Sequence, residues 1–162
     1  MKKKGFTLVE LLAVIAILAI LVIIALPNVL SMYNEAKKNT FVTEARKLYS
    51  GAKEKWMLNQ SSGIATFSNV EGITGATKLS IEGSQSNQYF IQIDPAGNVT
   101  RFLVTNKTYA LDITNTNGIE VQKIGTADDG GYGEAFDAEN TFTLKLSDDK
   151  TTASLDGAKK TK

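Results

Sequence analysis

Residues 6–26 read FTLVELLAVIAILAILVIIAL, an apolar stretch of 21 residues interrupted only by Thr7 and Glu10. As an α-helix that rises 1.5 Å per residue, the stretch is about 31 Å long, which matches the roughly 30 Å hydrocarbon core of a bilayer. Three lysines at positions 2–4 precede it, and basic residues stay on the cytoplasmic side of a membrane. The stretch therefore predicts a membrane-spanning helix with the chain after Leu26 exported.

The composition excludes most catalytic chemistry. The 162 residues include no Cys and no His, so disulfides, thiolate or imidazole metal ligands, a cysteine nucleophile and histidine-based triads are excluded. The 18 basic and 17 acidic side chains nearly balance, and a general nucleic-acid binder needs a basic excess to neutralise phosphates. We find no phosphate-binding glycine motif, Ser-Lys dyad or convincing carboxylate pair. The sequence predicts a protein that is not an enzyme and has no specific nucleic-acid partner.

The acidic residue within the apolar stretch needs an explanation. A secretory signal also combines a basic start with an apolar region, but its apolar region has about 7–15 residues and ends at a cleavage site of small residues. A carboxylate in a membrane-spanning helix is costly, so Glu10 should have a partner. A cut between Gly5 and Phe6 would create a free amine four residues before Glu10, on the same helical face. The alternative is an uncleaved anchor whose Glu10 reaches the cytoplasmic interface.

The segment resembles the N-terminus of type IV pilins and related pseudopilins. The match consists of three lysines and Gly5, then FTLVE at 6–10, then an apolar run that reaches Pro27. The resemblance implies that a prepilin peptidase cuts after Gly5 and N-methylates Phe6. It also implies that Glu10 pairs with the Phe6 amine of a neighbouring subunit during assembly. Such a pairing would select one stagger between subunits, because a shift by one turn would leave the carboxylate unpaired.

Pro27 marks the end of the apolar run. Proline lacks an amide proton and clashes with the carbonyl four residues back, so it should bend or open the helix there. In pilins this region can lose helical hydrogen bonds on assembly, which implies local melting near Pro27; a static kink is the alternative. The helical pattern then continues as an amphipathic segment to Leu58, with apolar residues three or four positions apart.

The remaining sequence predicts a β-rich head. The resulting organisation is a leader at 1–5, a long helix at 6–58 divided into 6–26 and 27–58, and a head at 59–162. The head shows alternating apolar residues separated by turn sequences, which is typical of antiparallel strands. The predicted strands are 88–93, 99–105, 109–113, 119–124, 141–147 and 151–155, with a short strand around 78–81 in a segment otherwise expected to be loop. The fold class is α+β, a pilin-like long helix packed on an antiparallel β-meander.

An acidic, glycine-rich segment at 125–140 is predicted to be a surface loop. Its carboxylates at Asp128, Asp129, Glu134 and Asp137 are hard oxygen ligands, and some pseudopilins hold calcium in a comparable loop. Their spacing does not match an EF-hand, and a solvated acidic loop is the alternative. We expect no cofactor, with calcium as the one metal worth testing.

These features predict the structural subunit of a type IV pilus, which polymerises through its N-terminal helix into a surface filament for adhesion, motility or DNA uptake. Identical subunits, a prepilin peptidase, a platform membrane protein and an assembly ATPase are partners that the resemblance implies. The precursor would reside in the cytoplasmic membrane and the filament outside the cell. The lack of Cys is shared with some Gram-positive pilins. Two alternatives remain, a pseudopilin of a type II secretion or competence machine and a membrane-anchored extracytoplasmic binding module that does not polymerise.

Overall fold

The long helix predicted from the sequence is present. The computed structural model describes residues 5–59, 62–81, 87–125, 132–134 and 143–156. Helix α1 spans Leu8–Asn59 and continues without interruption through Pro27. The chain divides into two compact units, residues 1–39 and 40–162, and the boundary between them lies within α1.

None of the described apolar side chains of the first unit is buried. Residues 5–37 are all exposed, and the large apolar side chains include Leu8 at 77% and Ile23 at 72% exposure. A helix that is apolar on every side needs surroundings that are apolar on every side, either lipid or other helices. By length and composition α1 can cross a membrane, with a mean hydropathy of 3.2 over its most apolar 18 residues.

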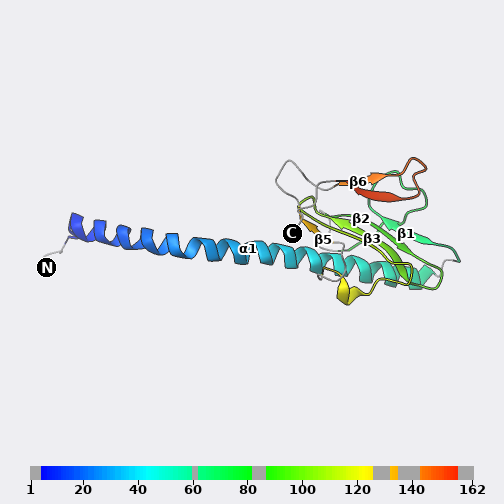
Figure 1. Ribbon diagram of the computed structural model, residues 1–162, viewed down its shortest axis with the longest axis horizontal. Coiled ribbons are helices and arrows are strands. Elements are labelled where there is room, and N and C mark those ends of the chain that lie inside the picture. The colour runs from blue at the N-terminus through cyan, green and yellow to red at the C-terminus, as the bar shows by residue number, and fades with distance from the viewer. Residues whose placement is uncertain (1–4, 60–61, 82–86, 126–131, 135–142, 157–162) are drawn as a thin grey trace. The chain divides into compact units, whose positions relative to one another are not determined.

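The second unit contains a five-stranded antiparallel sheet (Figure 1). Its strands lie in chain order: β1 Ala65–Ser68, β2 Gln88–Ile93, β3 Val99–Thr105, β4 Tyr109–Thr114 and β5 Tyr132–Glu134. The three strands predicted between 88 and 113 are confirmed. The loop between β2 and β3 closes through hydrogen bonds from the Asp94 amide to the Asn98 carbonyl and from the Gly97 amide to the Asp94 carbonyl, both 2.9 Å long.

One face of this sheet packs on the C-terminal part of α1, as the sequence predicted. Phe41 and Leu48 of α1 are almost fully buried, and Trp56 packs at the edge of the same cluster. Tyr89, Ile91 and Ile93 of β2 share this face, as their alternation predicted. Phe41 also contacts Tyr109 of β4, with ring centroids 5.7 Å apart. The helix therefore supplies five of the eighteen described buried residues of this cluster, and the sheet and its loops supply the rest.

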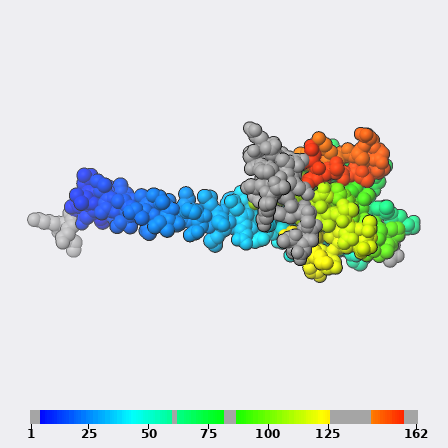
Figure 2. All heavy atoms as spheres, viewed as in Figure 1, coloured from blue at the N-terminus to red at the C-terminus, as the bar shows by residue number. Residues whose placement is uncertain are grey.

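The opposite face of the sheet is also covered. Strands β6 (Thr143–Leu146) and β7 (Ala153–Asp156) form the predicted final hairpin. Leu144 and Ala153 of this hairpin form a second buried cluster with Ile73 and with Phe90 and Leu103 of the sheet. Figure 2 shows the hairpin, in orange and red, as a surface region beside the green strands. The central strands β2 and β3 are consequently apolar on both faces.

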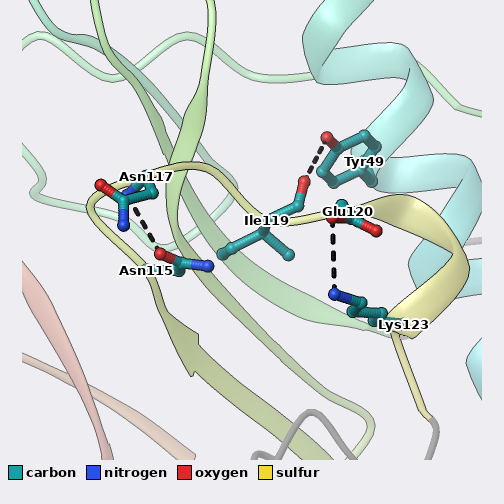
Figure 3. A network of polar contacts seen from close by, with 6 residues as sticks. All are labelled: Tyr49, Asn115, Asn117, Ile119, Glu120 and Lys123. Atoms are coloured by element: carbon teal, nitrogen blue, oxygen red, sulfur yellow. Dashed lines mark hydrogen bonds and ion pairs between the residues drawn. The ribbon is translucent and has the colours of Figure 1, made fainter.

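The predicted strand at 119–124 is wrong. The Ile119 N–H still donates to the Val99 carbonyl of β3 at 2.8 Å, but the segment then turns into a 3-10 helix, η1, at Val121–Lys123. Side chains of α1 bind three of the segment's carbonyl groups. The Tyr49 hydroxyl donates to the Ile119 carbonyl at 2.6 Å (Figure 3), and Arg46 donates to the carbonyls of Gln122 and Ile124. The side chains of Ile119 and Ile124 are still buried, so the apolar pattern reports burial rather than strand geometry.

Two further strand predictions need correction. The segment 78–81 contains no strand. Strand β1 lies earlier, and Thr77 pairs with it through an isolated parallel bridge to Phe67. The predicted loop at 125–140 contains β5, which pairs with β4; residues 126–131 and 135–140 of that segment lie outside the described residues. Both strands are short, and β5 is surrounded by glycines and acidic residues that hide any alternating pattern.

Candidate assembly site

The start of α1 is held by reciprocal hydrogen bonds between Thr7 and Glu10. The Glu10 carboxylate accepts the Thr7 backbone N–H at 2.8 Å and the Thr7 hydroxyl at 2.9 Å. In return, the Thr7 hydroxyl oxygen accepts the Glu10 backbone N–H at 3.3 Å. This arrangement is a capping box, in which a Thr and a Glu three residues later satisfy amide groups that the first helical turn leaves unpaired. Glu10 thus has a partner within its own chain.

The predicted cleavage site lies just before this cap. Residues 5–7 are outside the helix, and Phe6 is 84% exposed. No atom of the described residues would lie within 4 Å of a side chain built on Gly5. The peptide bond between Gly5 and Phe6 is therefore uncovered by the described residues. A cut there would leave the Thr7 amide in place, because that amide joins Phe6 to Thr7, so the capping box would survive processing.

Among the described residues, no ion pair joins an amine to the Glu10 carboxylate. In the uncut chain the Phe6 nitrogen is a peptide amide bonded to Gly5, and the hydrogen bonds to the Glu10 carboxylate come from Thr7. The pairing of Glu10 with a neighbouring Phe6 amine remains a prediction. The role of Thr7 was missed from the sequence, although the spacing Thr-x-x-Glu before an apolar run is a recognised sign of a capping box.

Pro27 lies within α1, and the helix continues on both sides of it. Without an amide proton, Pro27 leaves the carbonyl of Ile23 without its usual helical donor. Ile23, Leu26 and Val29 around it are exposed, so no tertiary contact of the first unit's described residues supports this turn. Local melting on assembly remains a prediction.

The calcium candidates cannot be assembled into a site. Asp128, Asp129 and Asp137 lie outside the described residues. Glu134 lies in β5, where its backbone pairs with Tyr109, and its side chain is outside the description. The described part of the chain contains no group of three or more acidic side chains that could hold a metal ion.

Comparison with protein families supports the interpretation of the N-terminus. Residues 1–26 match the model of the prokaryotic N-terminal methylation motif. The motif supports a type IV pilin-like protein. The match points to a structural subunit rather than an enzyme, and it implies processing by a prepilin peptidase in the context of pilus assembly. No curated protein and no solved structure matched the chain.

The match and the fold agree about the kind of precursor. A pilin-like precursor needs an apolar N-terminal helix for membrane anchoring and an α+β globular part, and the chain has both. A Gram-positive source has no support from the motif.

Proposed function

We propose that this chain is the structural subunit of a type IV pilus. The observation that carries the proposal is a methylation motif followed by an apolar helix whose described residues 5–37 are exposed all round. Such a helix fits a bilayer before assembly and a bundle of identical helices after it. Full burial of one Leu, Ile or Val side chain contributes roughly 1.5–3 kcal/mol relative to water, so the helix has a strong reason to avoid solvent in both states.

In the proposed pathway, a prepilin peptidase removes residues 1–5 in the cytoplasmic membrane and methylates Phe6. The platform protein and the assembly ATPase then extract the subunit, and residues 6–58 become the filament core while residues 59–162 form the head. The fibre would act outside the cell in adhesion, motility or DNA uptake.

Glu10 would fix the stagger of neighbouring subunits. The Thr7 cap gives the carboxylate two neutral hydrogen bonds in the single subunit. The charged amine of a neighbouring Phe6 would add an ion pair in a surrounding of low dielectric constant, where charge pairs are much stronger than in water. A neighbour shifted by one turn would lack this pair, so the correct register is favoured.

Two variants of Glu10 separate capping from charge pairing. Glu10→Gln keeps the capping box, because glutamine serves at this position as well as glutamate, but it carries no charge. Glu10→Val loses both. If pairing with the amine drives assembly, both variants insert and are processed normally, yet both yield few filaments in electron micrographs of sheared surface material. Abundant filaments from Glu10→Gln would show that the residue serves only as a helix cap.

The same micrographs separate the three functions that the motif allows. A pilus subunit gives long fibres that contain this chain. A pseudopilin gives short fibres only, and a membrane-anchored binding module gives none while the processed chain accumulates in the membrane.

A further inference from the structure

The second unit contains a pocket of about 340 Å³ between the end of α1 and the edge strand β1. Trp56 and Asn59 line it from the helix, Thr66 and Phe67 from β1, and Thr77 from the segment that bridges to β1. The volume is at the lower end of the roughly 300–1,000 Å³ typical of small-molecule sites.

The walls of this pocket are fixed by contacts that do not involve a ligand. The Thr77 carbonyl accepts the Ser68 N–H at 3.1 Å, and the Thr77 N–H donates to the Thr66 carbonyl at 2.9 Å. Both bonds involve only the backbone of Thr77, so they do not use its side-chain hydroxyl. On the helix side, the Trp56 ring packs on Gly97, where an added Cβ would come within 2.7 Å of the ring. The Lys53 ammonium group donates to the Gly97 carbonyl at 2.5 Å and holds that loop on α1. Because the site is preformed, little binding free energy is lost in ordering its side chains when a ligand binds.

The lining chemistry selects a neutral ligand. The eight lining residues that belong to the described part of the chain are all uncharged, which argues against a phosphate, a carboxylate or a metal ion. Trp56, which is half-buried, offers aromatic surface, while Asn59, Thr66 and Thr77 offer an amide and two hydroxyls that both donate and accept. Phe67 is almost fully buried and only closes the wall behind them. The indole N–H of Trp56 is itself buried and has no acceptor among the described residues, so the part of Trp56 that a ligand can reach is its ring. A ligand that matches has an apolar ring face and several hydroxyl groups.

We propose that this pocket binds a neutral saccharide, with a sugar ring on Trp56 and its hydroxyls on Asn59, Thr66 and Thr77. The proposal does not rest on polymerisation, because every residue involved belongs to the second unit of one chain. A negative filament experiment would leave it standing, and a negative binding experiment would leave the filament function standing.

Trp56 is the only tryptophan of the chain and lines the pocket, so all tryptophan fluorescence comes from this place in the fold. The full chain is solubilised in a zwitterionic detergent without a sugar headgroup and titrated with glucose, galactose, mannose and N-acetylglucosamine. We expect at least one of these sugars to produce a saturable change in Trp56 emission. The absence of a saturable change with all four sugars would overturn the proposal, as would a change produced only by a neutral peptide such as tetra-alanine.

Variants then test the assigned contacts. Thr77→Val keeps the shape of the side chain and the backbone bridge but removes the hydroxyl, and Asn59→Ala removes the amide. Each should weaken sugar binding about fivefold, the effect of one lost hydrogen bond. Thr74→Val is the matched control, because Thr74 is exposed in the same segment and does not line the pocket. Wild-type affinity in both pocket variants would overturn the assignment of the site.

Discussion

Thr7 and Glu10 satisfy each other's hydrogen-bonding groups at the first turn of α1, through contacts of 2.8, 2.9 and 3.3 Å. The carboxylate that we propose to act in assembly is therefore already engaged within its own subunit. Both hydrogen bonds from Thr7 end on the same carboxylate oxygen, Oε2, so an incoming amine can bind the other oxygen while the cap stays in place. The helix cap and the proposed subunit contact use the same side chain, which couples the order of the helix start to assembly.

Replacement of Thr7 should loosen the helix start. Thr7→Val removes the hydroxyl that caps the Glu10 amide, and loss of such a cap costs roughly 0.5–2 kcal/mol of helix stability. We expect faster amide exchange at Glu10 in the detergent-solubilised chain, measured by NMR. Thr7→Ser is the control, since serine keeps the hydroxyl and should restore slow exchange. Unchanged exchange at Glu10 in Thr7→Val would mean that the cap contributes nothing in detergent.

The fold could be predicted where one physical rule dominates. The apolar run after Gly5 and the amphipathic pattern around Phe41 and Leu48 gave the long helix, because hydrophobic periodicity decides helical burial. The alternation at Tyr89, Ile91 and Ile93 gave β2 in the same way. The prediction failed at 119–124, where the apolar residues are buried but Tyr49 and Arg46 bind the backbone carbonyls. Tertiary contacts of that kind leave no trace in the local sequence.

The candidate sites show the same contrast. The local pattern at residues 5–10 predicts the cleavage site and draws attention to Glu10. The capping role of Thr7 could have been predicted from the same short segment. The pocket beside β1 depends on Trp56, Thr66 and Thr77, which are brought together by the packing of a helix on a sheet. The sequence alone does not indicate that these three side chains lie together.

The hydrogen bond from Tyr49 to Ile119 should contribute measurably to the free energy of unfolding. In the wild-type chain the Tyr49 hydroxyl donates to the Ile119 carbonyl at 2.6 Å. Tyr49→Phe removes this donor. We expect a loss of roughly 0.5–1.5 kcal/mol in the free energy of unfolding, measured by denaturant titration followed by Trp56 fluorescence. Tyr33→Phe is the matched control: Tyr33 is 55% exposed, and a phenyl ring keeps the contact with Lys37. Equal losses in the two variants would contradict a specific role for the Tyr49 hydroxyl.

Asp149 should make the β6–β7 turn sensitive to acid. Hydrogen bonds from the Ser147 and Thr151 hydroxyls and from the Thr151 amide lower the pKa of Asp149 from 3.8 to about 2. Because the pKa is lower in the folded state, the carboxylate stabilises the turn fully above pH 3.8, and the stabilisation is lost as the pH falls toward 2. The Thr151 amide signal in NMR should therefore titrate with a midpoint near 2.

Two variants test this assignment. Asp149→Asn should abolish the titration of the Thr151 amide, while Asp148→Asn, which leaves the three hydrogen bonds to Asp149 in place, should not change it. A midpoint at 3.8 in the wild-type chain would mean that the turn is not formed in solution.

Gly97 should be the glycine of the β2–β3 loop that tolerates no side chain. Its φ of +86° disfavours any L residue by about 1–2 kcal/mol, and an added Cβ would lie 2.7 Å from the Trp56 ring. Overpacking of a core typically costs a further 1–3 kcal/mol. We expect Gly97→Ala to lower the free energy of unfolding by about 2–4 kcal/mol. Since the ring has to move, Trp56 emission in the folded state should also shift to longer wavelength.

The matched control for Gly97 is Gly63→Ala, because an added Cβ at residue 63 meets no atom of the described residues within 4 Å. This variant should leave both the unfolding free energy and the Trp56 emission close to the wild-type values. If Gly97→Ala behaved like Gly63→Ala, the contact between the β2–β3 loop and α1 would not exist in solution. The Trp56 ring, which lines the proposed saccharide pocket, would then lack one of the contacts that fix it, and only its packing against the core cluster would remain.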